Sequence, residues 1–293
     1  MKIAICISGF VRTWEYTKKS FIEQILQDKS NEYHIFIHTY NQNLYEATAE
    51  KQDMFLSENE IKSLFDGLNV KVLIIEDRTE TLPIIIKDSE KYKHLSNYHL
   101  QQPESSDKNS ITIPIGARTY DHLRKLHLCN ETRKKYETEN NVTYDLVVKT
   151  RFDLCYFNSP DWKSCLDGKV YFEYGACFGW PDDTFCITTP YVMDNWYANR
   201  FTKFDEMFIT GDNIINEMCS HQTLKWILEK GNIEISNNRI VNTNCFRSEN
   251  SLQFYGNYRQ KYNIYELYNK IISTCITNVY EIEKLKLSII NNI

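Results

Sequence analysis

The stretch YDLVVKTRFDLCYF, residues 144–157, indicates how this chain folds. Tyr144 and the apolar run 146–148 predict a short strand covered on both faces, as in a parallel sheet. Arg151 and Asp153 then interrupt the apolar pattern before it resumes. A buried charge without a partner is costly, so charged residues at the end of a core strand are typical of an opening, a partner or a ligand.

The segments before this stretch predict a parallel sheet with helices on its faces. The expected strands are 2–8, 33–40 and 70–77, and the expected helices are 14–27 and 57–65. Ser57 and Glu60 have the spacing of a capping box, which indicates where the second helix begins. A β-α-β-α-β alternation gives parallel strands, because its crossover connections return the chain to the same end of the sheet.

The rest of the chain continues the alternation of strands and helices. The polar stretch 87–110 predicts a surface loop, which is either a lid or an inert insertion. Further expected elements are a long helix over 118–139, strands at 170–174 and 184–189, a helix from Pro190, a helix over 209–231 with a cap at Gly231, and a C-terminal helix at about 264–291. We expect one domain, residues 1–260, with a C-terminal helix in 261–293 packed on it.

Composition excludes several functional classes. The formal net charge of −5 argues against a general nucleic-acid binder, whose surface would be basic. The sequence contains no apolar run long enough for a membrane span, which takes about 20 residues. The nine cysteines form no CxxC pair, which favours reduced thiols and a cytoplasmic location.

The segment SGFVRT, residues 8–13, is the first candidate for a binding site. It follows the first expected strand and precedes a helix, where open α/β sheets bind nucleotides. Ser8, Gly9 and Arg12 would then contact a phosphate or pyrophosphate. The segment matches neither GxGxxG nor a P-loop, so a dinucleotide fold or an NTPase gains no support. The alternative is a tight turn with a solvated arginine.

The segment TRFDL, residues 150–154, is the second candidate. Acidic residues at such a position hold Mn²⁺ or Mg²⁺ against a diphosphate, because a hard cation stabilises the charge of the leaving group. In the D-x-D form both ends are acidic, whereas here Arg151 replaces the first acid and Asp153 remains as the metal ligand. Arginine can itself neutralise a diphosphate. The alternative is a structural Arg–Asp pair at a strand end.

The segment FGWPDDTFCITTP, residues 178–190, is the third candidate. Neighbouring strand residues point to opposite faces, so at most one of Asp182 and Asp183 faces a given site. That carboxylate would either serve as general base for an acceptor hydroxyl or orient the sugar, with Asp183 preferred over Asp182 as the base. Trp180 is suited to stacking on a sugar ring. Solvated loop acids are the alternative, and His221 is expected to be a core or surface histidine.

The order of these motifs resembles GT-A-like glycosyltransferases of the WavE type and viral sugar transferases. In that group the strand reads approximately YDxVxxxRxD, which Tyr144, Asp145, Val147, Arg151 and Asp153 match. The resemblance covers residues 2 to 230 and implies a GT-A-like α/β fold with a mostly parallel central sheet. It also implies that Ser8, Gly9 and Arg12 bind the nucleotide, that Asp153 binds donor or metal, and that Asp182 and Asp183 lie near the sugar.

The resemblance further implies a cytoplasmic, hexosyltransferase-like enzyme of polysaccharide biosynthesis. Its donor would be a nucleoside diphosphate sugar, with a UDP-sugar expected, and its acceptor a glycan or glycolipid hydroxyl. Such families often keep an acidic residue where this chain has His221, Gln222 and Thr223, which leaves the identity of the general base open. Two alternatives remain: a nucleotide-sugar-binding module without turnover, and a sugar-phosphate nucleotidyltransferase.

Overall fold

The computed structural model describes residues 1–43, 54–103, 112–172, 181, 183–210, 215, 217–236, 241, 243–248 and 251–252. The expected helix in 261–293 and the domain boundary at residue 260 lie outside these residues. The same holds for Trp180 and Asp182.

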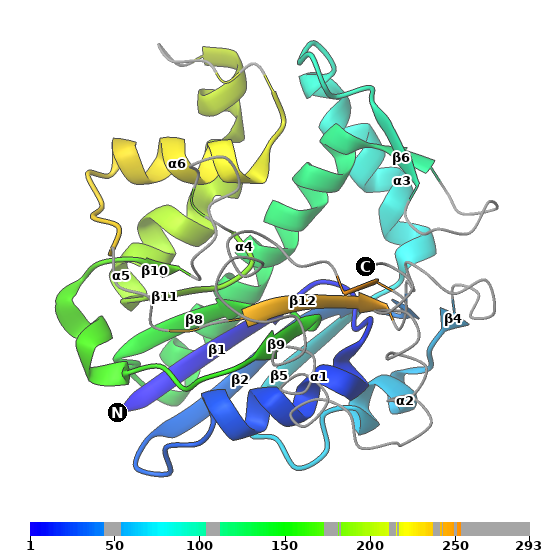
Figure 1. Ribbon diagram of the computed structural model, residues 1–293. Coiled ribbons are helices and arrows are strands. Elements are labelled where there is room, and N and C mark those ends of the chain that lie inside the picture. Colours follow the sequence, from blue (N-terminus) through cyan, green and yellow to red (C-terminus); the bar gives the residue numbers. More distant parts are fainter. Residues whose placement is uncertain are drawn as a thin grey trace.

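A six-stranded mixed sheet forms the centre of the protein, with the order β10-β11-β8-β1-β2-β5 (Figure 1). Its strands are β1 Lys2–Ser8, β2 Glu32–Tyr40, β5 Val70–Glu76, β8 Leu146–Thr150, β10 Tyr171–Phe172 and β11 Cys186–Thr188. Strands β5, β2, β1 and β8 are parallel, whereas β11 and β10 run antiparallel. The prediction of a mostly parallel α/β sheet is confirmed.

The remaining elements surround this sheet. The α-helices are α1 Trp14–Ser20, α2 Glu58–Ser63, α3 Arg78–Ser89, α4 Ile115–Asn140, α5 Pro190–Val192 and α6 Ser220–Lys230. The 3-10 and π turns are η1 Phe21–Ile25, η2 Glu90–Tyr92, η3 Trp162–Asp167, η5 Met193–Tyr197, η6 Ala198–Lys203 and η7 Glu206–Thr210. The short strands are β3 Gln42–Asn43, β4 Met54–Phe55, β6 Gln101–Pro103, β7 Thr112–Pro114, β9 Leu154–Tyr156, β12 Thr243–Ser248 and β13 Ser251–Leu252.

Helices cover both faces of the sheet, so the core has two halves. Alternation along β1 places Ile5 in the half that contains α1 and α2, and Cys6 in the half that contains α4 and α6. Figure 1 shows α1 and α2 on one side of the sheet and α4 and α6 on the other. This three-layer arrangement buries β1, β2 and β8 on both faces, as the apolar runs predict, whereas the residues of the edge strand β5 are half-buried.

The polar stretch 87–110 is more ordered than the predicted loop. It contains the end of α3, the turn η2 and the strand β6, which pairs with β7, although residues 104–110 are not described. Helix α3 was not predicted, because Pro83 and several polar residues obscure its periodicity. Asp77 nevertheless caps this helix, accepting hydrogen bonds from the backbone N–H groups of Thr79 and Glu80.

Helix α6 ends at Gly231, as predicted, but it begins at Ser220 and is shorter than the expected helix over 209–231. Gly231 keeps right-handed backbone angles, and the left-handed residue is Asn232, with φ of 49°. A Cβ atom on Gly231 would lie 2.6 Å from the Trp196 ring. Glycine is therefore required at this position by close packing rather than by the geometry of the helix end. Among the helices in the described ranges, none has the length and apolarity that crossing a bilayer would need.

Candidate functional site

The candidate site lies where β1 and β8 end. Ile7 of β1 and Thr150 of β8 are direct partners in the sheet, so the segments after them emerge side by side. Strand β11 runs the other way, and its register places the residues just before it at the same edge. Ligands of open α/β sheets bind beyond the carboxyl ends of the strands, which makes this edge the first place to look for chemistry.

The turn after β1 is sharply bent. Gly9 has a φ of 130°, and its backbone N–H donates to the carbonyl oxygen of His38 over 3.1 Å. Arg12 has a φ of 40°, which is uncommon for a residue with a side chain. Such a conformation persists only where the surroundings fix it, and it often marks a functional segment.

Arg12, Arg151 and Asp153 form one cluster, which we call the arginine–aspartate cluster. Arg12 Nη1 lies 3.2 Å from Asp153 Oδ2, while Arg151 Nε and Nη2 lie 2.9 and 2.6 Å from Oδ1 and Oδ2. Only 2% of the Asp153 side chain is exposed, compared with 11% of Arg12 and 17% of Arg151. Thr17 of α1 donates to the carbonyl oxygen of Phe152 and holds this turn against the helix.

This geometry changes the interpretation of Asp153. The carboxylate does not face an opening, because both of its oxygens accept from guanidinium groups in a buried position. A dication bound by Asp153 would stand beside two fixed positive charges, which makes the arrangement a poor fit for the expected Mn²⁺ or Mg²⁺. The residues of the D-x-D-like segment instead concentrate positive charge close to the sheet edge.

Asp183 pairs with a histidine that the sequence did not single out. His122 Nε2, from α4, lies 3.0 Å from Asp183 Oδ2, and 8% of the Asp183 side chain is exposed. Burial raises the pKa of Asp183, but the hydrogen bond and charge of His122 and the charge of Lys149 together hold it well below its ordinary value. Burial also lowers the pKa of His122, to about 4, despite the opposing effect of Asp183. At neutral pH the pair is therefore a carboxylate and a neutral imidazole.

Lys149 fixes the backbone that carries Asp183. Its side chain is buried near the carboxyl end of β8, and Nζ donates to the carbonyl oxygens of Asp183 and of Thr184, the latter over 3.1 Å. His221 of α6 completes the surroundings, because its Nδ1 lies 3.0 Å from the carbonyl oxygen of Pro181 and 3.9 Å from Asp183 Oδ1. The expectation that His221 would be an ordinary core or surface histidine overlooked this neighbourhood.

A second group of charged residues adjoins the arginine–aspartate cluster through Phe10. The Phe10 ring lies 5.9 Å from the Arg12 guanidinium carbon and 4.5 Å from Lys125 Nζ. Lys125 in turn lies 3.2 Å from Asp121 Oδ2, and the Tyr40 hydroxyl donates to Asp121 Oδ1 over 2.6 Å. Burial lowers the pKa of Lys125 to about 8, although Asp121 opposes that shift.

Positive charge therefore predominates at this edge in a protein that is acidic overall. The cationic side chains brought together are Arg12, Arg78, Arg124, Lys125, Lys149 and Arg151, and the carboxylates are Glu76, Asp121, Asp153 and Asp183. With Asp77, which lies between Glu76 and Arg78, six cations stand against five anions, whereas the whole chain carries a formal charge of −5. An anionic ligand is the natural complement of such a surface.

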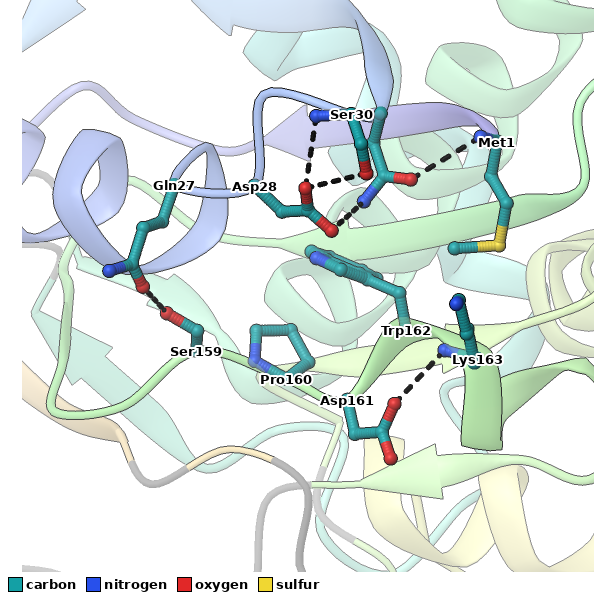
Figure 2. Close-up of a pocket in the computed structure, with 10 residues that line it drawn as sticks. Met1, Gln27, Asp28, Ser30, Ser159, Pro160, Asp161, Trp162 and Lys163 are labelled. Atoms are coloured by element: carbon teal, nitrogen blue, oxygen red, sulfur yellow. Dashed lines mark hydrogen bonds between the residues drawn. The ribbon is translucent and has the colours of Figure 1, made fainter.

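A pocket of about 310 Å³ lies near the opposite edge of the sheet, where β1 begins (Figure 2). Its lining includes Met1, Asp28 and Trp162. The Asp28 carboxylate already accepts hydrogen bonds from Ser30 and Asn31, so it has local structural partners. Among the described residues, the lining of this pocket has no group of titratable side chains comparable with the group at the other edge of the sheet.

Of the predicted site residues, the structure brings Arg12, Arg151 and Asp153 into one cluster, and it places Ser8 at the end of β1 and Gly9 in the turn that follows. Asp183 lies at the same edge, whereas Asp182 falls outside the described residues. Sequence reasoning missed His122. His122 lies in a helix rich in charged residues, and nothing in the sequence shows which strand end this turn of the helix packs against.

No protein-family model and no curated protein matches the chain. Among solved structures, it is similar to mouse xyloside xylosyltransferase 1, with 6% identity, a TM-score of 0.38, and coverage of 80% of this chain and 85% of that one. It is also similar to galactosyltransferase LgtC in complex with donor and acceptor sugar analogs (10% identity, TM-score 0.43, coverage 97% and 100%). A third is glycosyltransferase GlyE of Streptococcus pneumoniae TIGR4 (9% identity, TM-score 0.37, coverage 99% and 64%). At TM-scores below 0.5 such likeness establishes no activity, and the function has to be inferred from the site itself.

Proposed function

We propose that this protein is a glycosyltransferase that moves a sugar from a nucleoside diphosphate donor to a hydroxyl group of a glycan or glycolipid. The observation that carries the proposal is the juxtaposition of the arginine–aspartate cluster with the Asp183–His122 pair at one sheet edge. One half suits a diphosphate and the other suits proton transfer, which are the two requirements of this reaction.

Arg12 and Arg151 would bind the diphosphate of the donor. A guanidinium group presents its N–H donors in a planar fork that matches two phosphate oxygens. Asp153 holds both forks at the sheet edge, so the cations are already oriented before the donor arrives. When the bond from the sugar to the phosphate breaks, negative charge develops on the leaving diphosphate. Fixed cations stabilise that charge without having to reorganise.

A divalent cation is not needed to account for this charge stabilisation. A metal held by Asp153 fits poorly with the residues present, because both carboxylate oxygens already have guanidinium partners. The positive charge that a metal would supply to a diphosphate is offered here by Arg12 and Arg151.

The finer assignments extend this proposal. We take the donor to be a UDP-hexose and the pathway to be polysaccharide biosynthesis in the cytoplasm. Six cysteines in the described part of the chain are free thiols, which suits a reducing compartment: Cys6, Cys129, Cys155, Cys165, Cys186 and Cys219.

The test is to incubate the purified protein with UDP- and GDP-linked hexoses and to measure release of the nucleoside diphosphate, with and without glycan acceptors. A glycosyltransferase releases UDP or GDP and, with an acceptor, forms a glycoside. A binding module saturates with donor and releases nothing. A nucleotidyltransferase instead forms pyrophosphate from a nucleoside triphosphate and a sugar phosphate. Either of the last two outcomes rejects the proposal.

Substitutions then test the donor site. Arg151→Gln and Arg12→Ala should weaken binding of UDP at least tenfold in calorimetry, since each removes one phosphate contact. Lys135→Ala is the matched control, because it removes an exposed cation near the far end of α4. Equal UDP affinity in all three variants would show that the diphosphate binds elsewhere.

A further inference from the structure

Asp183 is poorly placed to take a proton from an acceptor, although its position favours a role in catalysis. Its side chain is almost entirely buried, and Oδ2 is hydrogen-bonded to Nε2 of His122 over 3.0 Å. Its pKa lies well below the ordinary value, because the interactions with His122 and Lys149 outweigh the effect of burial. A carboxylate that is both buried and weakly basic is better suited to orienting a neighbouring base than to accepting a proton from a substrate.

His122 has the complementary properties. A carboxylate can only accept hydrogen bonds, so Nε2 of His122 carries the proton that bonds to Asp183. The imidazole is neutral at pH 7, which leaves the lone pair on Nδ1. Within the described ranges Nδ1 has no hydrogen-bond partner, and 28% of the side chain is exposed. A neutral imidazole that a carboxylate orients and that keeps a ring nitrogen without a partner is the usual form of a general base.

The charged groups around His122 connect it to the donor. Asp183 raises its pKa, whereas the charges of Lys149 and Arg151 lower it. His221 approaches the other oxygen of Asp183. A diphosphate bound at Arg151 would offset part of the positive charge that suppresses protonation of His122. Donor binding would therefore make the imidazole more basic, at the moment when a base is required.

We infer that His122 is the general base that removes the proton of the acceptor hydroxyl, with Asp183 as its positioning residue; this inference depends on the proposed function. The acceptor oxygen forms a bond to the anomeric carbon while the bond from that carbon to the diphosphate oxygen breaks. The electron pair of the broken bond leaves with the diphosphate, and the proton passes to Nδ1 of His122. This single displacement inverts the configuration at the anomeric carbon.

His221 is less suited to the same role. Its Nδ1 is 3.0 Å from the carbonyl oxygen of Pro181 and 3.9 Å from Asp183, beyond hydrogen-bond distance. A backbone carbonyl orients a ring, but it stabilises the protonated imidazole less than a carboxylate does.

The experiment uses the full-length protein and the hexose donor from which it releases UDP or GDP. His122→Gln should lower kcat roughly 10²- to 10⁴-fold, the usual contribution of general base catalysis, with the donor KM changed less than threefold. His127→Gln is the matched control, since His127 lies on the same helix and stacks against Phe201 with ring centroids 5.7 Å apart. It should retain the kcat of the unsubstituted protein.

Three further readouts separate a base from a residue that only supports the fold. Added imidazole should restore activity to His122→Ala, because the small base can occupy the vacated space. Asp183→Asn should move the acid limb of the kcat profile to lower pH, since His122 then loses the charge that raises its pKa. The product formed by the unsubstituted protein should have inverted configuration, as measured by NMR coupling at the anomeric proton.

The inference is overturned if the kcat of His122→Gln lies within threefold of that of the active unsubstituted protein, or if the product retains the donor configuration. It is also overturned if imidazole fails to restore a folded His122→Ala. If the unsubstituted protein releases no nucleoside diphosphate from any donor, the proposed function itself fails, and this inference fails with it.

Discussion

Replacing Asp153 with asparagine should destabilise the protein, because its carboxylate is buried and paired with two arginines. The carboxylate accounts for contacts at 2.6, 2.9 and 3.2 Å to two guanidinium groups. Removing one partner of a buried ion pair typically costs about 3–5 kcal/mol. The two arginines would then repel each other by up to about 4 kcal/mol, taking a separation of roughly 4 Å and an effective dielectric of 20. Both are partly exposed and can turn outward, so we expect a net loss of about 3 kcal/mol.

Urea unfolding followed by tryptophan fluorescence measures this loss in Asp153→Asn. The control is Glu131→Gln, which removes one partner of the exposed Glu131–Lys134 pair and should cost less than about 0.5 kcal/mol. A double-mutant cycle that combines Asp153→Asn with Arg151→Gln should give an interaction free energy of at least about 1 kcal/mol, as expected for residues in direct contact. A cost below about 1 kcal/mol, with no coupling, would refute the reasoning. It would show that the carboxylate is solvated and faces the opening that the sequence alone suggests.

Other substitutions and conditions test separate parts of the structure. Gly231→Ala should destabilise the protein by about 1–3 kcal/mol, because the new Cβ atom would overlap the Trp196 ring. Asn232→Gly should be neutral or stabilising, because Asn232 has a positive φ. A higher urea midpoint for Gly231→Ala than for Asn232→Gly would contradict this packing. The folded-state pKa of His122 is depressed to about 4 from 6.5, so the unfolded chain takes up this proton first and stability falls as the pH drops through that interval. Between pH 7 and pH 4, the free energy of unfolding should therefore fall by on the order of 2 kcal/mol less in His122→Gln than in the unsubstituted protein. If the free energy of unfolding of both proteins depends on pH in the same way, the pKa of His122 is not depressed. Calorimetry of the ligand-free protein with Mn²⁺ should give little heat and EDTA should leave measurable turnover, whereas tight Mn²⁺ binding would show that Asp153 exchanges its arginine partners for metal.

Local sequence patterns predicted the sheet well, because apolar runs such as 2–8 and 146–148 report burial directly. The capping box at Ser57 and Glu60 was confirmed for the same reason, since both of its hydrogen bonds lie within one turn. Helix α3 was missed, because Pro83 and its polar neighbours give a weak helical period.

The site was harder to predict, because its contacts join residues that are distant in the chain. Arg12 and Asp153 are separated by 141 positions, and His122 and Asp183 by 61. Motif reasoning placed Arg12, Arg151 and Asp183 at strand ends, and the structure brings them to one edge of the sheet. It did not show that Asp153 would be covered, because burial there depends on which side chains close over it.

Lys149 restricts how this edge of the sheet can move. Its ammonium group is buried in β8 and bound to the backbone just before β11, so the strand that leads to Arg151 and the segment that carries Asp183 form one rigid unit. Sliding one past the other would break these buried hydrogen bonds. Opening and closing around a substrate would therefore have to hinge outside this unit. The spacing between Arg151 and Asp183 would then stay constant, while access to them changes.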